Sequence, residues 1–102
     1  MLAIKQWLET TGMTVAEERF LKPPALPYVV FTETTIVGGA DDKNLIADRQ
    51  ISVELYSDKI NVTAEQIVES LLNEIHYTKS RIWVQTEMFF QTVYDFTLTE
   101  KI

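Results

Sequence analysis

The feature that most constrains the fold is a strict alternation of apolar and mostly polar side chains over residues 50–57. The apolar residues are Ile51, Val53 and Leu55. The residues that alternate with them are Ser52, Glu54 and Tyr56. Successive side chains of a β-strand point to opposite faces, so this pattern predicts a strand with one apolar face. Such a strand is typical of an antiparallel sheet that packs on a core with one face only.

The other segments divide into helices and strands by the period of their apolar residues. Residues 2–11 have helical spacing before Gly12, and Thr63 with Gln66 forms a capping-box pattern before a second helix. The apolar face of that helix consists of Ile67, Val68, Leu71, Leu72 and Ile75. The predicted elements are helices 2–11 and 64–75, strands at about 13–20, 27–37, 48–57, 80–88 and 90–100, and a flexible loop at 38–47.

These elements fit a single domain over residues 1–102. A chain of 102 residues with 46% hydrophobic content can build one core. The predicted fold class is α+β, because amphipathic helices and half-apolar strands bury their apolar sides against each other. We expect two layers, a mostly antiparallel sheet of four or five strands with both helices packed on one face.

Aromatic side chains at outward positions of the strands are the first candidates for an interface. Tyr56 lies opposite the aliphatic residues of its strand, and Trp83 alternates with Ile82 and Val84. Large aromatic side chains are enriched at protein interfaces, and the alternative is that helix 2–11 covers some of them. The candidate interface residues are Tyr56, Trp83, Asp41, Asp42, Lys43 and Glu54.

The chain offers few side chains for chemistry. It has no cysteine and one histidine, His76, so a thiolate nucleophile, a disulfide and a histidine cluster for a metal are excluded. Asp41, Asp42, Asn44 and Asp48 do not have the spacing of a calcium-binding loop. We therefore predict that the protein is not an enzyme and has no catalytic residues, no cofactor and no metal ligands.

The charge balance bears on the kind of partner. The formal net charge is −6, and the basic residues are scattered, so we expect no nucleic-acid partner. The N-terminal residues are too polar for a membrane span, and the absence of cysteine gives no sign of an oxidising compartment. The sequence thus predicts a protein of the cytosol that does not enter a membrane.

Three segments in order resemble a known family. Residues 25–31 read Ala-Leu-Pro-Tyr-Val-Val-Phe, residues 49–57 form the alternating strand, and an amphipathic helix follows. This arrangement resembles the tail-completion or tail-terminator proteins, also called head-tail joining proteins, of long-tailed bacteriophages and prophages. The resemblance covers nearly the whole chain, although the acidic loop is longer than in typical members, so the contacts of that loop are not carried over.

The resemblance implies a structural role in the virion. It implies a subunit of a ring, commonly six-fold in that family, at the head-proximal end of the tail. Its partners would be other copies of itself, the tail tube protein and the head connector or stopper protein, and it would be in the host cytoplasm during assembly. The open edge of strand 26–37 and the loop 38–48 are the expected contact regions, because an unpaired strand edge is a ready pairing surface.

Two alternatives remain open at this point. The first is another protein of the neck, such as a head-side stopper, an adaptor or a minor capsid protein. The second is a small-molecule-binding α+β domain with a pocket between helix 64–75 and the sheet. For the core itself, we expect Leu71→Ala or Ile67→Ala to cost about 2–5 kcal/mol of stability.

Overall fold

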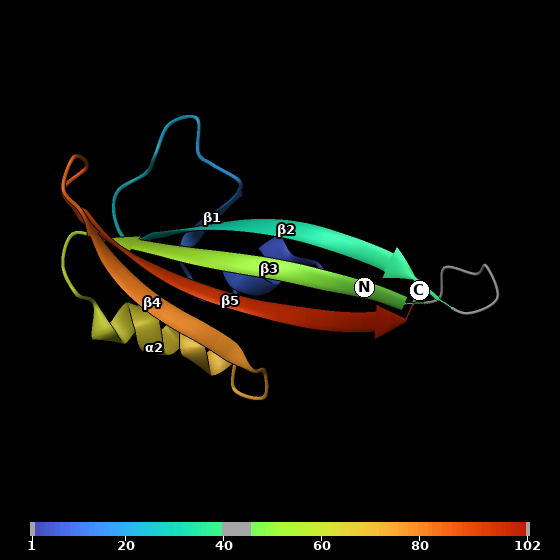
Figure 1. The fold of residues 1–102 in the computed structure, drawn as a ribbon. Coiled ribbons are helices and arrows are strands. Elements are labelled where there is room, and N and C mark those ends of the chain that lie inside the picture. Colours follow the sequence, from blue (N-terminus) through green and yellow to red (C-terminus); the bar gives the residue numbers. More distant parts are fainter. Residues whose placement is uncertain (1, 40–45, 102) are drawn as a thin grey trace.

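The computed structural model describes residues 2–39 and 46–101 as two helices and five strands (Figure 1). In chain order they are α1 (Ile4–Glu9), β1 (Thr14–Glu17), β2 (Tyr28–Gly38), β3 (Ile46–Ser57), α2 (Val62–Leu71), β4 (Tyr77–Val84) and β5 (Phe89–Lys101). This is the order of elements that the sequence predicts. The candidate interface residues Asp41, Asp42 and Lys43, and most of the predicted flexible loop, lie outside the described residues.

The five strands form one sheet in the order β1-β2-β3-β5-β4. Every neighbouring pair is antiparallel except β1 and β2, which run parallel over Thr14–Glu17 and Tyr28–Phe31. The predicted edge of strand 26–37 is therefore only partly open, because β1 pairs with Tyr28–Phe31. Beyond Phe31, β1 pairs with no residue of β2, and β4 forms the opposite edge of the sheet.

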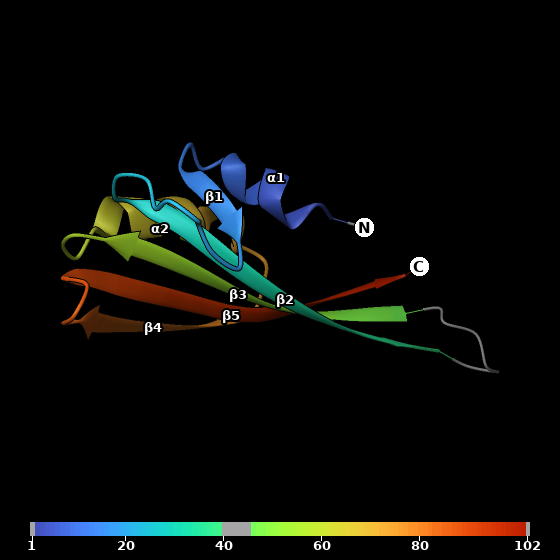
Figure 2. The ribbon, with the colours of Figure 1, turned by 90° about the horizontal axis from the view of Figure 1, so that it is seen from above.

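Both helices lie on the same side of the sheet, which confirms the predicted two-layer α+β fold (Figure 2). The core between the layers joins Leu8 of α1 and Val68 of α2 to Val29, Val53 and Tyr94 of the sheet, all with 0% exposure. In β3 the alternation is realised as predicted, since Ile51, Val53 and Leu55 are buried on the helix side. The opposite face of the sheet, which we call the open face, is covered by neither α1 nor α2 (Figure 2).

The helices are shorter than predicted, and their ends have local causes. The first helix begins after Ala3, and the chain leaves it through a turn in which Gly12 has a φ of +85°, a conformation that favours glycine. The second helix begins at Val62 because the side chain of Asn61, not Thr63, accepts a hydrogen bond from the backbone N–H of Ala64 at 3.0 Å.

The apolar face of α2 is also rotated from the predicted one. Val68 and Leu72 are buried, whereas Ile67 is 39% exposed. Its place in the core is taken by Ala64 and by Glu65, which is only 3% exposed. The expectation that Ile67 is a core residue is therefore wrong.

One residue with a positive φ follows the end of β1, and another precedes the start of β5. Glu18, with a φ of 67°, ends β1 well before the predicted boundary at residue 20, and its N–H donates to the carbonyl of Phe31 at 2.8 Å. The predicted strand 80–88 ends at Val84, because a turn begins there in which the N–H groups of Glu87 and Met88 donate to the carbonyl of Val84, and Met88 has a φ of 57°. That strand begins at Tyr77, because Tyr77 already pairs with Phe96.

The two faces of β4 are the reverse of the prediction. The register sets Trp83 opposite Phe90 on the helix side of the sheet, together with Lys79 and Arg81. Ile82 and Val84 consequently lie on the open face, and Ile82 is 53% exposed. Alternation alone gives two faces but does not say which one meets the core, and β4 is an edge strand whose helix side is occupied by charged side chains.

The ends of three strands project beyond the helices as a slender extension (Figure 2). We call this extension the arm and define it as residues 34–38 of β2, 46–50 of β3 and 97–101 of β5. It contributes to the elongated dimensions of the molecule, 51 × 29 × 23 Å. Ile36 and Val37 of the arm are 55% and 48% exposed, and Ile46 is 43% exposed.

Candidate interaction surfaces

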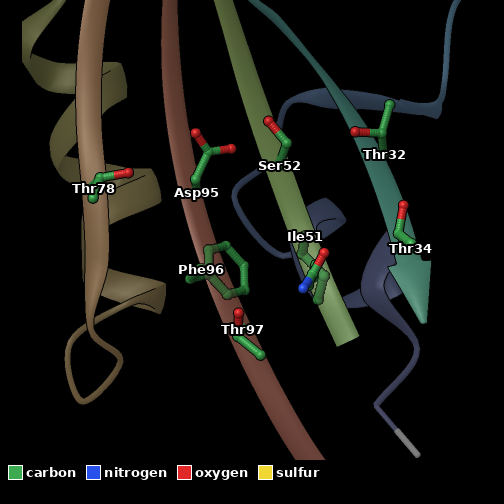
Figure 3. A pocket seen from close by; sticks show the side chains of 9 residues that line it. Thr32, Thr34, Ile51, Ser52, Thr78, Asp95, Phe96 and Thr97 are labelled. Atoms are coloured by element: carbon green, nitrogen blue, oxygen red, sulfur yellow. The ribbon is translucent and has the colours of Figure 1, made fainter. Parts of the chain in front are cut away.

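A polar field covers the centre of the open face (Figure 3). The strand register places its side chains in two rows that cross the sheet, Thr32, Ser52, Asp95 and Thr78 in one row, and Thr34, Gln50 and Thr97 in the next. These residues line a shallow hollow of about 440 Å³. Hydroxyl and amide groups of this kind can donate and accept hydrogen bonds, so the hollow suits a polar, hydrated contact.

An aromatic group adjoins this field toward the end of the sheet opposite the arm. The rings of Tyr28 and Tyr56 stack with centroids 5.1 Å apart, and Tyr56 meets the edge of Phe89 at 4.9 Å. Phe20 packs edge-on against Tyr28 at 5.2 Å. These rings line a groove of about 230 Å³ together with Glu18, Arg19, Pro23, Val30 and Glu87.

Glu54 and Tyr56 are held by a shared partner on this face. The amide nitrogen Nε2 of Gln91 donates to Glu54 Oε1 at 2.8 Å and to Tyr56 Oη at 3.0 Å. Burial raises the pKa of Glu54, and the negative charge of Asp95 raises that pKa further against the lowering by Gln91. Burial and then the charge of Glu54 raise the pKa of Tyr56. Both predicted interface residues thus lie on the open face, and Tyr56 is partly buried within it.

Trp83 does not share a surface with Tyr56, because it lies on the opposite side of the sheet. Its ring packs on Phe90 with centroids 4.8 Å apart, and its indole N–H donates to Gln85 Oε1 at 2.7 Å. It remains 40% exposed. The structure therefore separates the two aromatic candidates into different surfaces.

Glu65 is a buried acid that the sequence reading missed, and it joins α2 to the edge of the sheet. Arg81 donates to both of its oxygens at 2.6 and 2.8 Å, Lys79 donates at 3.0 Å and Thr92 at 3.1 Å. The hydrogen bonds from Arg81, acting against burial and helped by Lys79 and Thr92, lower the pKa of Glu65 to about 2. Lys79 also reaches Glu69 Oε2 at 2.7 Å.

A signal for this cluster was present in the sequence. Glu65 and Glu69 are four residues apart on a helix, and Lys79 and Arg81 are two residues apart on a strand. Each pair therefore lies on one face of its element. The matching charges indicate that the two faces meet.

Arg49 forms a second network on the helix side, at the base of the arm. Its guanidinium donates to both oxygens of Glu33 at 2.7 and 2.8 Å, to Glu100 at 3.2 Å and to the carbonyl of Leu2 at 2.7 Å. These contacts tie β2, β3, β5 and the N-terminal segment together. Arg49 is 5% exposed, so its side chain is buried at the end of the apolar core.

Residues that could take part in catalysis or hold a metal ion include His76 and the acidic side chains. His76 is exposed between α2 and β4. Among residues 2–39 and 46–101 no group of three or more His, Cys, Asp or Glu side chains could hold a metal ion. The prediction that the protein is not an enzyme rests on the sequence and stays a prediction.

The space between α2 and the sheet bears on the small-molecule alternative. Val68 and Tyr94 have 0% exposure and Leu72 has 1%, so apolar side chains fill the layer where that alternative puts a pocket.

Within the part of the chain that the structure describes, no helix has the length and apolar character needed to cross a membrane.

Comparisons with protein-family models and with curated proteins found no relative. The class that fold and surfaces define is an α+β protein with one open sheet face and a projecting three-stranded arm. The resemblance to tail-terminator proteins stays a prediction.

Proposed function

We propose that the chain is a non-enzymatic structural subunit of a phage or prophage virion, which assembles into a ring at the head-proximal end of the tail. In this role it would join the tail tube to the head connector, and six copies would match the resemblance. Other neck components, such as a stopper or adaptor, are the second candidate within the same structural class. The proposal is supported by the order of elements and by the free edges of the sheet.

The observation that carries the proposal is that the sheet has two different open strand edges on opposite sides. One is β4, whose outer side has no neighbouring strand among the described residues. The other is the stretch 32–38 of β2, beyond the residues that β1 covers. Unpaired backbone groups on a strand edge are a template for another strand. Two unlike edges permit a head-to-tail contact, which is the kind of contact that closes a ring.

The test is the mass of the assembly in solution, measured by light scattering over a range of protein concentrations. We expect a closed oligomer that forms as concentration rises, with a ring visible by electron microscopy. Ile82→Lys on β4 and Ile36→Lys on the arm should each weaken assembly at least about tenfold, because lysine on an edge strand opposes pairing. The matched control is Ile67→Lys on α2, where the side chain is 39% exposed and lies on a helix and not on a strand edge. A chain that stays monomeric at high concentration and does not bind tail tubes would contradict the proposal.

A further inference from the structure

The ionic groups of the sheet are divided unequally between its two faces. Every ion pair of the described residues lies on the helix side, where Arg49 pairs with Glu33 and Glu100, and Lys79 and Arg81 pair with acids of α2. On the described strands, the register assigns one cation to the open face, Lys101 at the end of β5. The open face therefore has little positive charge of its own.

The carboxylates of the open face are satisfied by neutral groups. Asp48 accepts a hydrogen bond from Thr99 at 2.7 Å, and Glu54 accepts from Gln91 at 2.8 Å. Asp95 lines the polar hollow on the same face. Partial burial near a second carboxylate disfavours the charged form of Glu54, which a nearby cation would favour. A partner would supply that cation.

The aromatic groove beside these acids suits the same kind of group. The faces of aromatic rings attract the guanidinium of arginine and the ammonium of lysine. Tyr56 stands between the two parts of the surface, because it stacks on Tyr28 in the groove and shares Gln91 with Glu54. Glu18 and Glu87 line the groove, and among the described residues Arg19 is the one basic residue that does so.

We propose that the open sheet face is a docking surface for a basic protein partner, with an arginine or lysine of that partner seated between the aromatic groove and Glu54. The hydroxyl rows of the hollow would make hydrated contacts around this anchor. The inference goes beyond the proposed function, since it concerns the face of the sheet and not the strand edges that would close a ring. It holds whether or not the chain assembles through those edges.

Charge also selects among the possible occupants. A nucleic acid has the same sign as this face and is repelled by it. A second copy is a poorer match, because the described basic residues outside the helix-side ion pairs are scattered and no segment holds more than two of them: Lys5 is in α1, Arg19 and Lys22 are in the connection between β1 and β2, Lys59 is in the connection between β3 and α2, and Lys101 is at the end of β5. A separate basic protein is the occupant that fits.

The experiment uses the full chain, labelled for NMR, and three probes at low salt: hexa-arginine, hexa-lysine and a neutral hexa-citrulline peptide. We expect saturable shifts of the backbone amides around Glu54, Tyr56 and Asp95 with the cationic peptides and none with the neutral one. Hexa-arginine should bind more tightly than hexa-lysine. The double variant Glu54→Gln with Asp95→Asn should weaken binding at least about tenfold, and Tyr56→Leu should remove the preference for arginine.

The matched control is Glu74→Gln with Asp58→Asn, which removes the same charge from two exposed positions off the sheet and should change binding less than about twofold. An equal loss in both double variants would mean general charge attraction and would overturn the inference. Shifts of the same amides on simple concentration of the protein would make a second copy the occupant. Saturable binding of a single-stranded oligonucleotide at this face would contradict it as well.

Discussion

The two faces of the sheet differ in what their side chains contact. On the helix side, apolar residues fill the core, and Arg49, Lys79 and Arg81 are bound to carboxylates. On the open face, Glu54 and Asp95 form no ion pair with a described residue, and aromatic rings and hydroxyls are partly in contact with solvent. A contact satisfied within the chain stabilises the fold, whereas a group without an internal partner is available to another molecule. The comparison predicts that changes on the helix side alter stability, and changes on the open face alter binding.

The largest effect is expected in the core on the helix side. Leu72→Ala should lower the free energy of unfolding by about 2–5 kcal/mol, because Leu72 is 1% exposed and truncation leaves a cavity beneath the sheet. Chemical denaturation followed by circular dichroism measures this change. A loss below about 1 kcal/mol would show that α2 is not packed as described.

The next largest loss of stability is expected when Glu65 is changed, and this loss should depend on pH. The folded pKa of about 2 lies below the value of about 4.3 expected for an unfolded chain. The stabilisation is therefore complete above the unfolded pKa and is lost as pH falls through the folded pKa, between about pH 5 and pH 2. By the size of this shift, Glu65→Gln should cost about 3 kcal/mol at neutral pH.

Denaturation at a series of pH values tests this, with Glu74→Gln as the control at an exposed position of the same charge. The difference between the natural chain and Glu65→Gln should shrink toward zero as pH falls to about 2. A constant difference across that range would mean that the variant acts through packing and not through charge.

Ile67→Ala distinguishes the position predicted from sequence, which is in the core, from the position in the structure, which is partly exposed. The sequence reading expects a core loss, whereas a side chain that is 39% exposed should cost less than about 1 kcal/mol. Leu72→Ala, at the C-cap of α2, is the buried comparison, since Leu72 is 1% exposed. Equal losses in the two variants would support the face predicted from sequence.

The smallest effect on stability is expected on the open face. Thr32→Ala removes an exposed hydroxyl from the polar row and should change the free energy of unfolding by no more than about 0.5 kcal/mol. Thermal denaturation of the variant measures it. A loss comparable to that of a core residue would mean that the open face contributes to the fold, and the contrast between the two faces would fail.

The sequence predicts the fold well because most elements have a strong period. The alternation in β3 and the helical spacing of apolar residues in α2 indicate the α+β class, although the buried face of α2 is rotated from the predicted one. The period does not say which side of an edge strand meets the core, so the faces of β4 were reversed. Glu65 was missed because an acid on a helix is ordinarily solvated, and its burial depends on Arg81 arriving from a distant strand.

The candidate surfaces were predictable only in part. Tyr56 and Glu54 were found because outward positions follow directly from alternation in β3. Their separation from Trp83 depends on strand order and register, which involve pairing between segments far apart in the sequence. The arm also follows from pairing, since β2, β3 and β5 all continue past the helices.

The central claim is that assembly uses the strand edges and leaves the helix layer unchanged, and hydrogen exchange tests it most directly. Amide exchange would be measured in a dilute sample and at a concentration at which the chain is assembled. The account predicts slower exchange in β4 and in residues 32–38 of β2 upon assembly, with no change in α2. Assembly that slows exchange in α2 and leaves both strand edges unprotected would contradict it.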